Sequence, residues 1–149
     1  MERTTSPPFF WTRWLLVVSI GVMAFGLVLV IAPAFALQGF SLLVYFDQSR
    51  ISSFGPEAAR YIALSHAVLG GVMFGWGMAL AVLVRTFFAA GYRVSWNMVA
   101  LSVGAWFIPD TGYSLASGYW QNAVLNLIFL ILFAVPLMAT RRLFRGIEA

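Results

Sequence analysis

The stretch Trp106–Asn122 reads WFIPDTGYSLASGYWQN and separates two long apolar runs. Pro109 and two glycines interrupt its apolar character, and Asp110 and Gln121 are among the residues that make it polar. Proline and glycine are the strongest local signals for the end of a regular element. We therefore expect one helix to end and another to begin here, with the polar side chains as candidates for a site.

The apolar run before this stretch is short for a membrane span. It extends from Ser95 to Ile108, which is 14 residues, or about 21 Å at about 1.5 Å per residue. The hydrocarbon core of a bilayer is about 30 Å thick. We therefore expect a bent or broken outer end of the third helix: either the helix continues, bent, through Pro109 to about Ser117, or it breaks and irregular backbone completes the crossing.

The composition is that of an integral membrane protein. Of 149 residues, 62% are hydrophobic and 9% are charged, whereas soluble domains carry about 25% charged residues. The first apolar run exceeds the ~7–15 residues of a signal-peptide core, which favours a span over a signal. We predict a single all-α domain over 1–149, a transmembrane four-helix bundle with spans at about 14–37, 57–84, 95–117 and 119–138.

Several classes of site are excluded by residue content. The chain has no cysteine and one histidine, so thiolate and multi-histidine metal sites are excluded, and we expect no metal and no cofactor. Phosphate-binding glycine loops, nucleophile elbows and zinc-protease motifs are absent from the sequence. The net charge of +4 comes from arginines at span ends, so we expect no nucleic-acid partner.

The arginines predict the orientation. Seven of nine lie near the N-terminus, after the second span or near the C-terminus, namely Arg3, Arg13, Arg85, Arg93, Arg141, Arg142 and Arg145. The other side holds Arg50 and Arg60. The positive-inside rule therefore predicts four spans with both termini in the cytoplasm.

The longest connection, residues 38–57, is expected to lie in the membrane interface. Pro33 should bend or end the last turn of the first span, and Gln38-Gly39 should break the helix. The apolar segment Phe40–Phe46 is too short to cross a bilayer. Gly55-Pro56-Glu57 is a typical helix start, since proline suits the first helical position and an acid suits the positive end of the dipole.

The second span carries small residues at every fourth position. These are Ala59, Ala63, Ala67, Gly71, Gly75 and Ala79. In lipid, helices associate through close backbone approach, which small residues permit. Two interpretations stay open: packing within the chain against the first or fourth span, or a seam to a second copy or another membrane protein.

Polar residues gather in the predicted outer half of the membrane. Asn122 and Asn126 lie one turn apart on the fourth span, and the set is His66, Asp110, Tyr113, Gln121, Asn122 and Asn126. His66 and Asp110 are candidate catalytic residues, with His66 as base and Asp110 as its orienter; the other four are candidate ligand-binding residues. Alternatively, Asp110 lies in an exposed turn, His66 bonds a neighbouring helix, and the asparagines are interhelical links.

The layout resembles the small four-span bacterial inner-membrane proteins grouped as DoxX-like. The resemblance lies in Arg13 before the first span, Pro33 at its end, the glycines of the second span (Gly70-Gly71 and Gly75-x-Gly77), and the Gly-Tyr-Ser-Leu turn at Gly112–Leu115. It covers most of residues 13–140. It implies the fold and the location, and brings no catalytic signature to residues of this chain.

Three functions are consistent with these patterns. The first is an accessory or interaction protein that docks through the small-residue stripe, as a homo-oligomer or with another membrane protein. The second is a binder or carrier of a lipid or other hydrophobic small molecule in the outer polar region. The third is a small membrane enzyme that moves a proton with His66 and Asp110.

Overall fold

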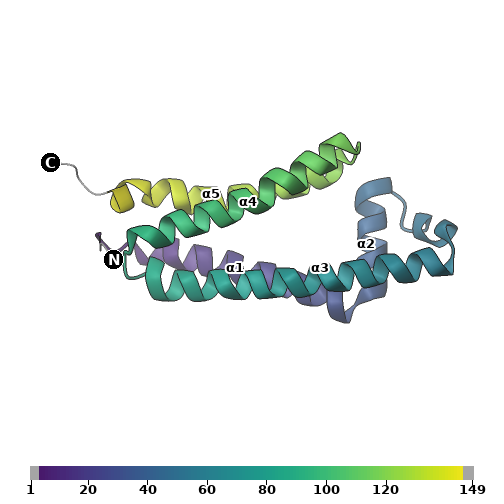
Figure 1. Ribbon diagram of the computed structural model, residues 1–149, viewed down its shortest axis with the longest axis horizontal. Helices are drawn as coiled ribbons and strands as arrows, with labels where there is room; N and C mark the ends of the chain where they lie inside the picture. The colour runs from purple at the N-terminus through teal and green to yellow at the C-terminus, as the bar shows by residue number, and fades with distance from the viewer. Residues whose placement is uncertain (1–3, 146–149) are drawn as a thin grey trace. The chain divides into compact units, whose positions relative to one another are not determined.

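The computed structural model describes residues 4–145, with the backbone alone for Arg145. Arg3, which entered the prediction of orientation, lies outside this range. The described residues are mostly helical and contain no strand. In chain order the elements are α1 (Phe9–Ile31), α2 (Pro33–Tyr45), η1 (Arg50–Phe54), α3 (Pro56–Leu83), η2 (Val84–Phe88), α4 (Arg93–Ala116) and α5 (Trp120–Arg145), as Figure 1 shows.

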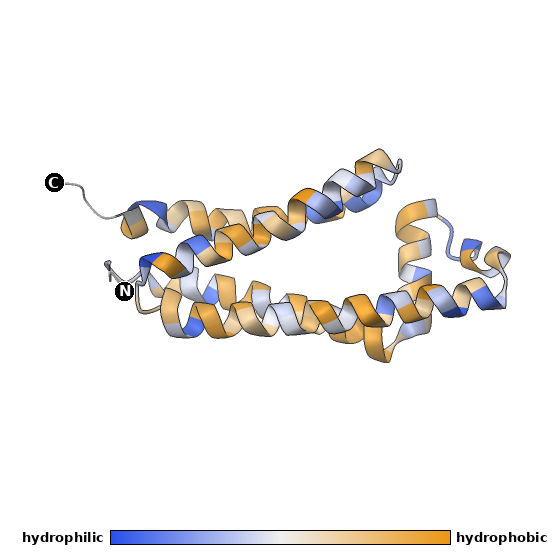
Figure 2. Cartoon of the chain, in the orientation of Figure 1, coloured by the Kyte–Doolittle hydropathy of each residue, from blue (hydrophilic) through white to orange (hydrophobic). Residues whose placement is uncertain are grey.

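Three helical stretches are long and apolar enough to cross a membrane. They are Phe9–Ile31, Pro56–Phe88 and Trp120–Phe144. Figure 2 shows hydrophobic colour along most of their length, with hydrophilic colour collected toward helix ends. The chain is therefore a helical membrane protein by length and composition. Helix α4, which corresponds to the third predicted span (95–117), is not among the three, so that span stays a prediction.

The chain forms two compact units. One is Gly21–Gly77, and the other joins Met1–Ile20 to Met78–Ala149. The boundaries fall within α1 and α3, so each unit takes part of both helices. We describe the Gly21–Gly77 unit first.

Pro33 separates two helices. Helix α1 ends at Ile31, and Ala32, with φ −127° and ψ 59°, has left the helical region. A residue before proline is pushed out of that region by the proline ring, and proline itself suits the first helical position. The predicted end of the first helix at Pro33 is thus confirmed, and the same proline begins α2.

The predicted helix break at Gln38-Gly39 is wrong. Helix α2 continues through both residues to Tyr45 and ends where Phe46 adopts a left-handed φ of 55°, its N–H donating to the Leu42 carbonyl at 2.9 Å. One glycine inside a helix costs only about 1 kcal/mol, which neighbouring residues can offset. Much of the expected interfacial loop is therefore helix, and Figure 1 shows α2 running across α3 and not along it.

Two glycines form the contact between α1 and α3 in this unit. A Cβ added to Gly26 would lie 2.6 Å from the Gly70 carbonyl oxygen, and one added to Gly70 would lie 2.8 Å from the Leu29 Cβ and even closer to the Gly26 carbonyl. Real Cβ atoms do not approach this closely, so the two backbones meet only because neither residue has a side chain.

In the other unit, α3 is longer than expected. It continues as the π-helical turn η2 to Phe88, whereas the predicted second span ended at about residue 84. Gly91, with φ +73°, makes the turn into α4. The N–H and hydroxyl of Thr4 both donate to the Gly91 carbonyl at 2.8 Å, which holds the N-terminal segment against this turn.

Helices α4 and α5 pack along each other and both continue through a proline. Helix α4 passes Pro109 without a break, so the broken-helix alternative is wrong. Pro136 within α5 lacks an N–H and leaves the carbonyl four residues earlier, that of Leu132, without its helical partner. The Trp14 indole donates to that carbonyl at 2.9 Å, which offsets the lost bond.

Candidate functional site

Asp110 is the centre of a polar cluster between α4 and α5. One carboxyl oxygen, Oδ1, accepts a hydrogen bond from the Asn122 amide at 2.9 Å. The other, Oδ2, accepts one from the Trp106 indole at 3.2 Å. Residues 106 and 110 are one turn apart, so their side chains share a face of α4, while Asn122 lies on α5. The carboxyl group therefore joins the two helices.

Ser114 completes the cluster. Its hydroxyl donates to the Asp110 carbonyl at 2.7 Å and accepts from the Asn122 amide at 2.8 Å. Both hydrogens of the Asn122 amide are thus engaged, one by Asp110 and one by Ser114. Ser114 is 5% exposed, so water has little access to the hydrogen bonds of its hydroxyl group.

A second hydrogen bond between α4 and α5 lies one turn farther along α5. Asn126, 3% exposed, donates from its amide to the Thr111 hydroxyl at 3.2 Å. Asn122 and Asn126 share a face of α5, as their spacing predicted, and both meet α4. Interhelical hydrogen bonds of this kind contribute about 0.6–2 kcal/mol each. The geometry matches the alternative in which the asparagines are interhelical links.

The cluster has no metal-binding set. Among residues 4–145, no group of three His, Asp or Glu side chains lies close enough together to hold a metal ion. The side chains named above bond mainly to one another. Their chemistry is that of a hydrogen-bonded lock between two helices, with one carboxyl group at its centre.

Two of the other predicted ligand-binding residues lie differently. Tyr113 is 74% exposed. Gln121 is half-buried on the first turn of α5. A role for either in binding a ligand stays a prediction.

His66 lies in the Gly21–Gly77 unit, on α3. Its ring stacks on Phe40 of α2, with ring centroids 4.6 Å apart and an interplanar angle of 24°. Its Nδ1 atom is buried and has no hydrogen-bond partner among the described residues. Asp110 belongs to the other unit, so the proposed pairing of His66 with Asp110 stays a prediction.

The small-residue stripe of α3 is partly covered and partly open. Ala63 and Ala67 are half-buried, whereas Gly71, Gly75 and Ala79 are exposed. A Cβ added to Gly71 or Gly75 would meet nothing within 4 Å. The glycine that packs against α1 is the neighbouring Gly70, which the spacing by four did not include. The Gly70-Gly71 doublet, together with Gly26 in α1, is the sequence signal for that contact.

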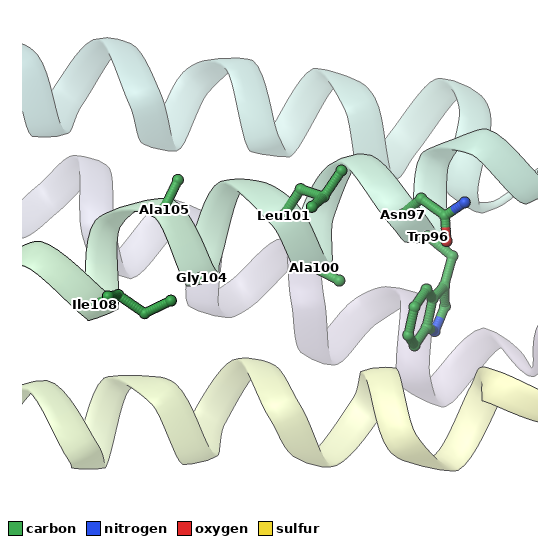
Figure 3. A pocket seen from close by; sticks show the side chains of 7 residues that line it. All are labelled: Trp96, Asn97, Ala100, Leu101, Gly104, Ala105 and Ile108. Atoms are coloured by element: carbon green, nitrogen blue, oxygen red, sulfur yellow. The ribbon is translucent and has the colours of Figure 1, made fainter.

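Sequence reasoning missed an apolar hollow on α4. It has a volume of about 550 Å³ and is lined by Trp96, Asn97, Ala100, Leu101, Gly104, Ala105 and Ile108. Figure 3 shows Trp96 and Ala100 on one side of α4, with Leu101 and Ala105 on the other. Trp96, Ala100 and Gly104 also line a hollow of about 220 Å³ between α4 and α5. Ala100 and Gly104, two small residues spaced by four on α4, are the signal that could have revealed it.

The chain was compared with protein-family models, curated proteins and solved structures, and none of them matches it. The DoxX-like resemblance therefore stays a prediction.

Proposed function

We propose that this chain is a multi-pass membrane protein that docks another transmembrane helix on the exposed face of α3. In this proposal α4 also crosses the membrane, as the third of four spans, and both termini are cytoplasmic, as the arginine distribution favours. The DoxX-like resemblance favours a bacterial inner membrane. The partner is a second copy or another membrane protein. The role is that of an accessory or interaction subunit.

The observation that carries the proposal is the difference between adjacent glycines. Gly70 is buried, and the space where its side chain would lie is already occupied by the Gly26 backbone. Gly71 is exposed, and no atom of its unit would meet a Cβ there. The same holds for Gly75, one turn along the helix. The fold of the unit therefore does not require a glycine at 71 or 75.

A helix from another chain could approach α3 closely only if positions 71 and 75 are glycine. Gly71 and Gly75 form a GxxxG pair, which lets two helix backbones approach closely. Val68 and Val72, exposed on the same side of α3, border the pair with branched apolar side chains. Exposed glycines beside branched apolar side chains are the kind of surface that helix packing in lipid uses, because association there depends on van der Waals contact.

The test is Gly71→Leu in the full-length chain. We expect it to remove the partner, measured as native mass and co-purified protein in mild detergent, while the helical content and melting temperature stay unchanged. Gly21→Leu is the matched control, since Gly21 is also an exposed helical glycine with open space around it. If Gly71→Leu and Gly21→Leu give the same mass and the same partners as the unmodified chain, α3 is not the docking helix.

A further inference from the structure

The seam between α4 and α5 is incompletely filled near the end that carries the arginines. Its walls are Trp96, Ala100, Val103 and Gly104 from α4 and Leu130, Ala134, Leu137, Met138 and Arg141 from α5. A Cβ added to Gly104 would meet nothing within 4 Å, which independently shows room at this point. The seam is an open hollow of about 220 Å³, and every wall residue except Arg141 is apolar or an indole.

The indole in this wall has no hydrogen left to offer a ligand. The Trp96 Nε1 donates to the Leu137 carbonyl at 2.9 Å, which fixes the ring between the two helices. Trp96 therefore presents its apolar ring to the seam. The site selects for a hydrocarbon segment along its length.

The length of the seam matches one leaflet. From Leu130 to Arg141 is 11 residues along α5, or about 16 Å. Half of a hydrocarbon core of about 30 Å is about 15 Å. An acyl chain in the seam would therefore extend from the leaflet surface at Arg141 to the middle of the bilayer.

The mouth of the seam is positively charged. Arg141 and Arg142 are exposed. In this unit Asp110 is the one acidic residue that the structure describes, and it lies 14 residues along α4 from Trp96, or about 21 Å away. No described carboxyl group of this unit therefore competes with a phosphate at this end.

We propose that this seam binds an anionic phospholipid, with one acyl chain between α4 and α5 and the phosphate at Arg141. The hollow of about 550 Å³ on α4 shares Trp96, Ala100 and Gly104 with the seam. It provides an adjacent apolar surface for the second acyl chain. Basic pockets between transmembrane helices are suited to anionic headgroups, because the ion pair forms at the low-dielectric edge of the bilayer.

The probe is phosphatidylglycerol added to the delipidated full-length protein in detergent, with phosphatidylcholine of the same acyl chains as the neutral comparison. Retained lipid is counted by native mass spectrometry. We expect phosphatidylglycerol to bind more tightly than phosphatidylcholine. Arg141→Gln should weaken phosphatidylglycerol binding by about fivefold, and Gly104→Leu should weaken the binding of both lipids by filling the seam.

Arg85→Gln is the matched control, since Arg85 is an exposed arginine of the same unit that does not line the seam. A melting curve of each variant shows that it has folded. The proposal is overturned if Arg85→Gln weakens binding as much as Arg141→Gln, if the two lipids bind equally, or if a folded Gly104→Leu protein binds both lipids as before. Gly71→Leu should leave lipid binding unchanged, so failure here is distinct from failure of docking on α3.

Discussion

Glycines in the two units serve opposite purposes. Where α1 meets α3, Gly26 and Gly70 are needed because another backbone occupies the place of their side chains. Between α4 and α5, Gly104 leaves space that nothing fills, and the helices are joined farther along by the hydrogen bonds of Asp110 and Asn122. A small residue in a helix of this protein thus marks a close contact in one place and unfilled space in another, and the neighbouring atoms decide which.

The largest expected effect is at the close contact. Gly26→Val should destabilise the protein by about 3 kcal/mol or more, because the new side chain collides with the backbone of α3. The measurement is unfolding in mixed micelles. Gly21→Val, on the same helix with open space around it, should change stability by less than about 1 kcal/mol. Equal losses in the two variants would mean that the glycine contact is not what joins α1 to α3.

The second-largest effect is expected at the hydrogen-bonded cluster of Asp110, Ser114 and Asn122. Asn122→Ala removes two donors and leaves oxygens of Asp110 and Ser114 without them, and we expect a loss of about 1–2 kcal/mol. Tyr113→Ala, at an exposed neighbouring site, should change the free energy of unfolding by less than about 0.5 kcal/mol. If Asn122→Ala costs no more than Tyr113→Ala, the cluster does not hold α4 to α5.

A smaller effect is expected at the carbonyl that Pro136 leaves free. Trp14→Phe removes the donor to the Leu132 carbonyl and should cost about 1 kcal/mol. Pro136→Ala restores a backbone N–H for that carbonyl. In a double-mutant cycle the cost of Trp14→Phe should therefore be smaller in the Pro136→Ala background. An unchanged cost would show that the indole contributes by packing alone.

The smallest effect concerns the exposed turn after α2. Hydrogen bonds from the Ser49 hydroxyl and N–H hold the pKa of Asp47 below its ordinary value of 3.8. Because the folded-state pKa is lowered, these bonds stabilise the turn above pH 3.8 and are lost as the pH falls through the folded-state pKa. The NMR shift of the backbone amide of residue 49 should titrate with a midpoint below pH 3.8. Ser49→Ala should raise the pH of that midpoint. A midpoint unaffected by Ser49→Ala would contradict this cause.

The sequence alone predicts the helices α1, α3 and α5 and part of the hydrogen-bonded cluster around Asp110. Long apolar runs predict α1, α3 and α5 because burial in lipid depends on composition, and the i, i+4 spacing placed Asn122 and Asn126 on one face. The choice between Gly70 and Gly71 could not be predicted, because it depends on how α3 is rotated against α1. The donor for the Leu132 carbonyl lies 118 residues away in the chain, so no local pattern reveals it.

The central claim is that adjacent glycines on α3 have opposite roles, and the pair Gly70→Ala and Gly71→Ala tests it most directly. Each variant adds one methyl group to the same helix, so helix propensity changes equally. We predict that Gly70→Ala lowers the free energy of unfolding by about 1–3 kcal/mol, while Gly71→Ala leaves it unchanged or raises it by less than about 1 kcal/mol. Equal effects of the two substitutions, or a greater loss for Gly71→Ala, would contradict the account.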